Sequence, residues 1–357
     1  MEENKQHKTA LPETEPIPSA QAPEALLDIR GLRVEYHTDE DVVYAVNGLD
    51  LTIGKGESLG LVGETGAGKT TTALSVLRLI ADPPGKIMGG EIWFEGEDML
   101  QAKPARLREI RGSKISVIFQ DPMTSLNPVY SVGDQIAEVI HQHEKCSKEE
   151  GRRKAGDMLE MVGIPRARYD EYPHQFSGGM KQRVVIAMSI ACSPELILAD
   201  EPTTALDVTI QAQILDLLRS INEKLGTSII LITHDLGVVA QVCDRVAIMY
   251  AGEIVESGTI AEVFDHPHHP YTIGLFGSIP SLDETAEKLK PIQGQMPDPT
   301  ELPEGCAFAP RCPYATGACR TRKPEMTGVG GTQMVRCLAH QGVFESPELM
   351  EEVRHGR

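Results

Sequence analysis

The sequence predicts an α/β fold built around a parallel sheet with helices on both faces, and three observations support this prediction. Short apolar runs rich in Val, Leu and Ile alternate with segments whose apolar residues recur every three to four positions. A glycine-rich loop at 63–68 directly follows one strand-like run and precedes a helical segment. After about residue 265 prolines become frequent enough to break any long element, so we expect a loop-rich extension there.

The individual elements follow from composition and periodicity in chain order. Residues 1–24 are dominated by Pro, Glu, Ser and Gln without apolar periodicity, and they are expected to form a flexible tail. Strands are expected at 27–36, 44–53, 58–62, 194–200, 228–233 and 246–251, with a further strand pair at 91–94 and 115–119. Helices are expected at 70–80, 131–172 and 210–225, where apolar residues share one helical face.

Composition limits the classes of function. The 357 residues suggest two domains, or one large domain with an appendage, and a hydrophobic content of 41% is enough to bury a substantial core. Lys and Arg number 34 against 52 Asp and Glu, and the resulting net charge of −18 argues against a nucleic-acid binder. No apolar stretch approaches the ~18 residues of a membrane span, and the N-terminus lacks the apolar core of a signal peptide. We therefore expect a cytosolic protein, or one that sits against a membrane through a partner.

The glycine-rich loop carries the clearest chemical signal. It reads Gly63-Glu64-Thr65-Gly66-Ala67-Gly68-Lys69-Thr70, which fits the pattern G-x-x-x-x-G-K-[ST] at every fixed position. Glycines let backbone N–H groups close around phosphate oxygens, and the N-terminus of the following helix adds a favourable partial charge. Lys69 is predicted to reach the β- and γ-phosphates and the Thr70 hydroxyl to bind Mg²⁺. Thr71 completes the predicted nucleotide-binding set.

A second element of such a site is the apolar run at 196–199, which ends in Asp200-Glu201-Pro202. Asp200 is predicted to hold Mg²⁺ through water, and Glu201 is predicted to orient and polarise the attacking water. Strands often end in acidic turns, so the pattern alone is weak. Its position after the phosphate loop, and the motifs between the two, favour the catalytic interpretation.

Residues 176–182, Phe-Ser-Gly-Gly-Met-Lys-Gln, resemble the signature motif of the ATP-binding cassette (ABC) ATPases. A serine and two glycines that open a helix form an anion site of the same kind as the first loop. The family order of motifs is present in full: phosphate loop, Gln120, signature, Asp200-Glu201 and His234. The resemblance implies a P-loop NTPase core with an antiparallel β subdomain and a helical subdomain, which binds ATP with Mg²⁺ and hydrolyses it.

The same resemblance implies roles for further residues. Gln120 looks like the glutamine that senses Mg²⁺ and the γ-phosphate, and His234 looks like the switch histidine that contacts the γ-phosphate. The residues implied to bind the nucleotide of the opposite subunit are Ser177, Gly178, Gly179 and, in Ala205-Leu206-Asp207, Asp207. Tyr36 fits the aromatic residue that stacks on adenine, with Tyr44 as the alternative.

Within the family, the sequence is most similar to the ATPase subunits of oligopeptide, dipeptide and nickel importers. The supporting stretches are QDPMTSLNP at 120–128, DEPTTALDVT at 200–209 and HPYT at 269–272. The resemblance covers about residues 26–340. It implies an ABC ATPase domain at 25–264, with a helical subdomain at about 121–178, and a C-terminal extension of the oligopeptide-transporter type at 265–357.

Such a subunit is a peripheral protein on the cytoplasmic face of the cell membrane. The resemblance implies two integral-membrane permease subunits, an extracytoplasmic solute-binding protein, and a second ABC ATPase subunit that is a paralogue or another copy of this chain. Residues 121–172 are implied to dock onto the permeases. The expected function is ATP-driven import of oligopeptides or dipeptides, and nickel import is the alternative. A soluble ABC ATPase acting on DNA or ribosomes is disfavoured, because Gln120 and Ser177 are too close for a long coiled-coil insertion.

Four of the seven cysteines, Cys306, Cys312, Cys319 and Cys337, fall in one Pro- and Gly-rich window with the spacing C-x5-C-x6-C-x17-C. The remaining three are expected to be packing residues, with Cys192 in an apolar helix, Cys243 near a strand and Cys146 in a polar linker. Disulfides are disfavoured in a reducing compartment, whereas a metal centre would stabilise a window without an apolar core. Four thiolates suit Zn²⁺ or an iron–sulfur cluster, and free thiols are the third possibility. The resemblance to peptide-importer ATPases implies a [4Fe–4S] cluster of structural or regulatory role.

Overall fold

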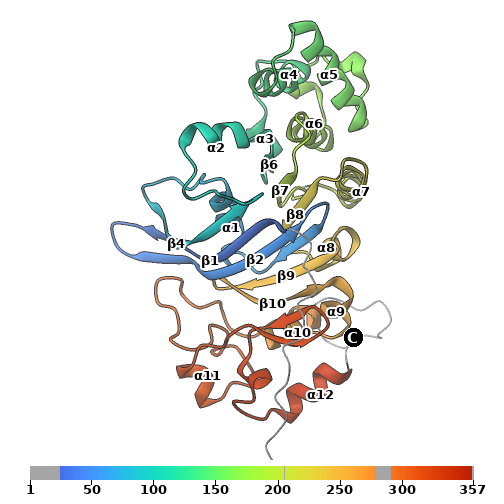
Figure 1. The fold of residues 1–357 in the computed structure, drawn as a ribbon. Coiled ribbons are helices and arrows are strands. Elements are labelled where there is room, and N and C mark those ends of the chain that lie inside the picture. Colours follow the sequence, from blue (N-terminus) through green and yellow to red (C-terminus); the bar gives the residue numbers. More distant parts are fainter. Residues whose placement is uncertain (1–24, 205, 279–290, 356–357) are drawn as a thin grey trace, which may run out of the picture.

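Two sheets organise the chain in the computed structural model, which describes residues 25–204, 206–278 and 291–355 (Figure 1). One sheet has four strands in the order β2-β1-β4-β5, and the other has eight in the order β11-β12-β10-β9-β3-β8-β7-β6. The expected tail at 1–24 lies outside the described residues. Within the described ranges, no helix combines the length and apolar character needed to cross a bilayer.

The four-stranded sheet is antiparallel throughout. It consists of β1 (Ala25–His37), β2 (Val42–Gly54), β4 (Gly85–Phe94) and β5 (Glu97–Asp98). The expected pairing of 91–94 with 115–119 is wrong, because β4 pairs with β1, whereas β6 (Ile115–Ile118) pairs with β7 in the other sheet. Apolar alternation identifies a strand but does not identify its neighbour.

The eight-stranded sheet has a parallel centre formed by β6, β7 (Leu196–Asp200), β8 (Ser228–Thr233), β3 (Ser58–Val62) and β9 (Arg245–Tyr250). Strands β3, β7 and β8 are buried along their whole length, as expected where both faces of a parallel sheet are covered. Three further strands, which the sequence did not predict, extend one edge in antiparallel register: β10 (Glu253–Thr259), β11 (Thr327–Gly330) and β12 (Gln333–Val335).

Helices cover both faces of this sheet and extend beyond it. They are α1 (Lys69–Val76), α2 (Pro104–Ile110), α3 (Pro122–Ser125), α4 (Val132–His143), α5 (Lys148–Met161), α6 (Gly178–Ile190), α7 (Val208–Leu225), α8 (Leu236–Val242) and α9 (Ile260–Asp265). One apolar core lies between the two sheets and includes α1, and another packs α4–α7 against the far side of the larger sheet. Figure 1 shows α4–α6 at one end of the molecule and the C-terminal extension at the opposite end.

Several helix boundaries differ from the expectation. The helix expected at 70–80 ends at Val76, because Arg78 has a positive φ of 50°. The region expected to be helical at 131–172 contains two α-helices and a short 3₁₀ helix at Arg166–Arg168, and Ser147 caps the second α-helix. Cys192 lies just after α6 rather than within a helix.

The extension is joined to the cassette by both sheet and core. Strand β12 pairs with β10, with Val335 opposite Glu256. The aromatic rings of Tyr271 and Phe308 pack against Tyr250 of β9. The α-helices in the described part of this region are α10 (Pro270–Gly277), α11 (Gly317–Thr321) and α12 (Pro347–His355). Residues after 265 therefore bury apolar surface against the same sheet that carries the phosphate loop.

Candidate functional site

The glycines of the phosphate loop are required by close packing as well as by conformation. A Cβ on Gly63 would lie 2.2 Å from the carbonyl oxygen of Met249. Gly68, the N-cap of α1, has a φ of 101°, and its Cβ would lie 2.3 Å from the carbonyl oxygen of Ala45. The loop between β3 and α1 is therefore pressed against neighbouring strands. This packing holds the backbone of the loop next to the N-terminus of α1, where the first N–H groups of the helix have no partner within the helix.

Lys69 folds back over this loop. Its Nζ donates to the carbonyl oxygens of Gly63, at 2.7 Å, and Glu64, at 3.0 Å. Burial lowers the pKa of Lys69, although the nearby carboxylates of Glu201 and Asp200 act in the opposite direction. The ammonium group is thus already confined to the loop that the sequence predicts to bind phosphates.

Asp200 ends β7 and is only 6% exposed. Its Oδ1 finds no hydrogen-bond partner in the described part of the chain, and burial raises the pKa of the carboxyl, whereas a hydrogen bond with Thr70 lowers it. A buried carboxylate oxygen without a partner, next to a threonine hydroxyl, is the oxygen donor set that suits Mg²⁺. The residues present therefore fit the predicted cation.

Glu201 is the centre of a polar cluster and has an unusual backbone, with a φ of 44°. Its carboxylate contacts Gln120 Nε2 at 3.0 Å, Thr204 Oγ1 at 2.8 Å and His234 Nδ1 at 3.0 Å. Burial alone would raise the pKa of Glu201, but hydrogen bonds from His234 and Thr204, together with nearby positive charge, lower it overall. The structure thus brings together the three predicted catalytic residues Gln120, Glu201 and His234, which come from three different segments.

Thr204 is a functional candidate that sequence reasoning missed. It lies three residues after Glu201 in the same turn, and its hydroxyl donates to Glu201 Oε2. The only signal in the sequence was a threonine three residues after a glutamate. This pattern is too common in turns to predict a contact.

An open cleft of about 480 Å³ joins the loop to this cluster. The predicted residues that line it are Tyr36, Thr65, Gly66, Gly68, Lys69, Thr70, Thr71, Gln120, Glu201 and His234. The Tyr36 hydroxyl lies 3.2 Å from Thr71 Oγ1. Among the described residues the cleft wall includes Tyr36 rather than Tyr44, and it also includes Pro299 of the extension, which the sequence did not predict.

The signature residues lie away from this cleft. Ser177 caps α6 by accepting from the Met180 N–H, and Asp207 caps α7 by accepting from the Ile210 N–H. A Cβ on Gly179 would lie 2.4 Å from Ile210 Cγ2, so the starts of α6 and α7 pack against each other. In the described chain, Ser177, Gly178, Gly179 and Asp207 do not line their own subunit's cleft. Ala205 lies outside the described residues.

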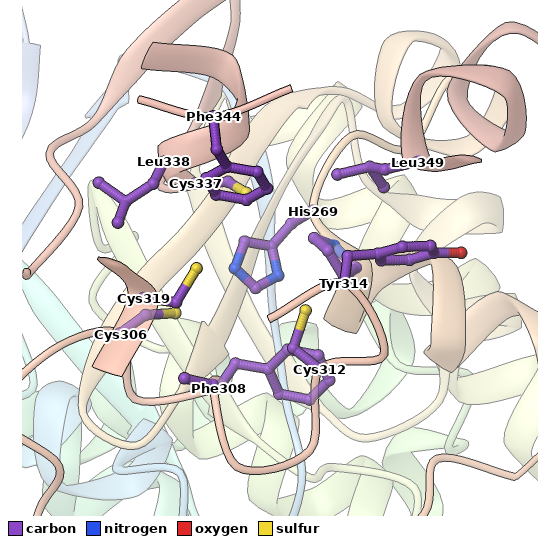
Figure 2. A pocket seen from close by; sticks show the side chains of 12 residues that line it. His269, Cys306, Phe308, Cys312, Tyr314, Cys319, Cys337, Leu338, Phe344 and Leu349 are labelled. Atoms are coloured by element: carbon purple, nitrogen blue, oxygen red, sulfur yellow. The ribbon is translucent and has the colours of Figure 1, made fainter. Parts of the chain in front are cut away.

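The four clustered cysteines line one small cavity with a volume of about 20 Å³ (Figure 2). Its wall is otherwise mainly apolar and includes Phe308, Leu338, Phe344 and Leu349. Burial raises the pKa of the Cys312 thiol to about 12 and that of Cys337 to about 11. Among the described residues, no group of three or more Cys, His, Asp or Glu side chains is positioned to hold a single metal ion.

His269 also lines this cavity, and Figure 2 shows its ring between the cysteines. Its Nδ1 accepts from the Tyr271 N–H at 3.0 Å, and the ring makes a further backbone hydrogen bond with Arg336. Burial lowers the pKa of His269 to about 3, so the ring is neutral. Both of these hydrogen bonds hold the His269 ring within the fold.

A phosphate loop, a buried carboxylate and a Glu–His–Gln cluster around one cleft define a nucleotide-hydrolysing protein of the P-loop class. The chain belongs to the ATP-binding cassette transporter family, as an ATPase whose hydrolysis is coupled to transport. Residues 46–204 match the family model described as ABC transporter. Residues 255–319 match the model described as the C-terminal region of oligopeptide/dipeptide transporters.

Two relatives and one solved structure define this similarity further. The chain is 51% identical over 332 residues to the oligopeptide transport ATP-binding protein OppD of Bacillus subtilis, covering 91% of this chain and 93% of that protein. It is 48% identical over 316 residues to the dipeptide transport ATP-binding protein DppD of Bacillus subtilis, covering 88% and 94%. The ATP-binding cassette MJ0796, solved as a dimer with ADP and Pi, superposes with a TM-score of 0.59 at 29% identity, covering 66% of this chain and 98% of that one.

Proposed function

We propose that this chain is the subunit that powers uptake of oligopeptides or dipeptides through a membrane importer, acting at the cytoplasmic face. ATP hydrolysis is supported chiefly by the position of the Glu201 carboxylate. Gln120 and His234 contact this carboxylate in the cleft that the phosphate loop also lines. Peptides as the transported solute are supported by the names of the relatives and by the match of residues 255–319 to the C-terminal region of oligopeptide/dipeptide transporters. Nickel is the alternative solute.

In the proposed mechanism each residue has a distinct task. The loop N–H groups and Lys69 bind the phosphates, and Thr70 and Asp200 would hold Mg²⁺, which supplies charge neutralisation at the phosphates. Glu201 orients the attacking water through its carboxylate, and the lowered pKa further favours the ionised form of this group. His234 and Gln120 hold that carboxylate in place through the hydrogen bonds described above.

We further propose that two ATPase subunits close on two ATP molecules, with Ser177, Gly178, Gly179 and Asp207 contacting the partner's nucleotide. The support is positional, because the helix start at Ser177 lies outside the subunit's own described cleft. The partner is a paralogue or a second copy of this chain. An ATP-dependent dimer of the Glu201→Gln variant, measured by light scattering, is expected to be lost on Ser177→Arg; an unaffected dimer would contradict this assignment.

A second groove supports the proposed permease contact. It has a volume of about 710 Å³ and lies where β6 meets α3, α4 and α6. Its wall includes Leu79 and Phe119, which are 37% and 45% exposed, together with Thr124, Val139 and Met188. Exposed apolar side chains around a groove are typical of a docking site for an amphipathic helix.

Site-specific photocross-linking tests this contact without disturbing the native cysteines. A photoreactive residue at Thr124 or Tyr130 is expected to capture a permease subunit in membranes that contain the assembled importer. The same residue at Glu348 of α12 serves as the control. Capture from position 348 alone would overturn the proposed docking surface.

We also propose that the cysteine cavity holds a [4Fe–4S] cluster, with Zn²⁺ as the alternative. Cys306, Cys312, Cys319 and Cys337 line one small cavity, which at about 20 Å³ must widen to admit a cluster. A cluster of this type would be held by four thiolates that bind different iron atoms rather than one point. The raised thiol pKa values mean that binding must release protons, so metal loading is expected to increase with pH.

Metal analysis tests the cluster directly. Protein purified without oxygen is expected to be brown and to contain iron and acid-labile sulfide. Both are expected to fall in Cys312→Ser and to persist in Cys192→Ser, whose thiol lies outside the cavity. One stoichiometric zinc would favour the alternative, and metal-free folded protein with four titratable thiols would reject both.

The transported solute is tested at the level of the whole importer. Co-purification of the permeases and the binding protein, followed by identification of the bound solute, is expected to yield peptides of a few residues. Nickel bound in their place would reject the peptide proposal and leave the ATPase assignment intact.

A further inference from the structure

Arg311 of the extension makes its principal ion pair with the phosphate loop. Its Nη1 lies 3.1 Å and 3.0 Å from the two carboxylate oxygens of Glu64, a residue 247 positions earlier in the chain. The Arg311 side chain is only 6% exposed, whereas that of Glu64 is 32% exposed. Nη1 also donates to the Tyr250 hydroxyl at 3.4 Å, and Nε donates to the Gln293 carbonyl at 3.2 Å. Burial and several partners fix this guanidinium in one position.

Glu64 is the second residue of the loop that must accept a strongly negative ligand. An unpaired carboxylate at this position would repel phosphate groups, since like charges at close range are unfavourable in a partly desolvated site. The Arg311 guanidinium supplies the compensating positive charge from outside the loop. The ion pair therefore bears on the electrostatics of phosphate binding as well as on packing.

The backbone of Glu64 is held by the extension too. Its N–H donates to the hydroxyl of Tyr271, a fully buried residue of α10, at 3.1 Å. Further along, the Tyr44 N–H donates to the carbonyl of Pro299 at 2.8 Å, and Pro299 lines the cleft. The extension thus contacts the phosphate loop at Glu64 and contributes Pro299 to the wall of the cleft.

We propose that Arg311 is a positioning residue for ATP: it neutralises and holds Glu64, and through this contact the C-terminal extension forms part of the nucleotide site. This inference rests on the proposed phosphate-binding role of residues 63–70. Arg311 acts through Glu64 and does not itself touch the reacting atoms.

The test is a double-mutant cycle on nucleotide affinity in the full chain, measured with a fluorescent ATP analogue and Mg²⁺. Arg311→Met is expected to weaken binding by about tenfold, the scale of losing one partly buried charge pair. Arg311→Lys, which keeps the charge but loses the forked geometry, is expected to lose less. In a Glu64→Gln background, Arg311→Met is expected to change affinity by less than about twofold, because the charge that needs compensation is gone.

Two controls make the outcome interpretable. Lys323→Met breaks another ion pair between the extension and the sheet, the one with Glu253 on β10, and is expected to leave nucleotide affinity unchanged. Lys69→Ala is expected to abolish binding, and retained binding there would overturn the proposed site rather than this inference. Each variant's fold is checked by its thermal unfolding midpoint.

The inference fails under two results. In the first, Arg311→Met binds the nucleotide as tightly as the wild type while Lys69→Ala does not bind it. This result would show that the ion pair has no effect on the loop. An equal loss from Arg311→Met in the wild-type and Glu64→Gln backgrounds would show that Arg311 acts by another route. If Arg311→Met does not fold, the Arg311→Lys and Glu64→Gln variants complete the same comparison.

Discussion

The nucleotide cleft collects side chains from residue 36 to residue 299, whereas the cysteine cavity is lined mostly by one stretch, 306–349, with His269 and Pro270 added. The cleft is open, and most of its charged and polar side chains follow strands of the larger sheet, of which β3, β7 and β8 are fully buried. The cavity is small and apolar, and several of its lining residues belong to the apolar cluster of the extension. Substitutions in the cleft should therefore alter chemistry while sparing the fold, and substitutions around the cavity should do the reverse.

The largest expected effect lies in the cleft. Glu201→Gln removes the carboxylate that orients water but preserves side-chain size, so kcat is expected to fall by about 10³-fold or more. ATP affinity and the thermal unfolding midpoint are expected to stay close to those of the wild type. Turnover assays together with calorimetric ATP binding measure both quantities, and near-normal hydrolysis would remove Glu201 from the catalytic role.

The opposite pattern is expected at the cavity. Leu349 of α12 is fully buried against it, and Leu349→Ala is expected to cost about 2–4 kcal/mol of unfolding free energy. Its kcat at saturating ATP is expected to match the wild type below the unfolding transition, because Leu349 lies outside the cleft. Denaturant titration and turnover assays test this separation. A large fall in kcat without loss of stability would break the contrast between the two regions.

A pH effect of intermediate size is expected where the extension meets the sheet. Glu256 is fully buried on β10 and accepts from the His268 and His269 N–H groups and from Gln333 Nε2, and burial raises its pKa to about 7. Between about pH 4.5 and 7 the folded chain therefore keeps a proton that the unfolded chain releases, so this group's contribution to stability falls as pH rises. The full loss is on the order of 3 kcal/mol by the shift in pKa.

Glu256→Gln removes this titration. The unfolding free energy of the variant relative to wild type is expected to increase from pH 5 to pH 7, whatever its absolute value. Urea unfolding at several pH values measures the difference, with Glu253→Gln, also on β10, as the matched control. A pH-independent difference between Glu256→Gln and wild type would contradict the assignment.

The smallest expected effect is at Thr204. Removing its hydroxyl deletes one of the hydrogen bonds that lower the pKa of Glu201, so Thr204→Ala is expected to reduce kcat by about fivefold, the scale of one hydrogen bond. The acid limb of the rate profile is expected to move to higher pH, because the pKa of Glu201 rises. A lower kcat with an unmoved acid limb would indicate a structural role instead.

Much of the cleft was predictable because its signals are local. The phosphate loop occupies eight consecutive residues, and its glycines are required by the contacts that Gly63 and Gly68 make with neighbouring backbone. The acids at the end of β7 follow a wholly apolar run, and the gathering of Gln120, Glu201 and His234 follows from the known order of motifs. The window with four cysteines was likewise recognisable as a local excess of cysteine, and all four cysteines line one cavity in the structure.

The sequence by itself determined which residue types carry the chemistry and in which segments, because those patterns span only a few residues. Only the tertiary structure decided which segments meet: that β4 pairs with β1 and not with β6, and that Arg311 reaches Glu64. Such contacts depend on how strands pair and cores pack across hundreds of residues. Apolar alternation and single charges are compatible with many pairings, and the burial of the whole chain selects one of them.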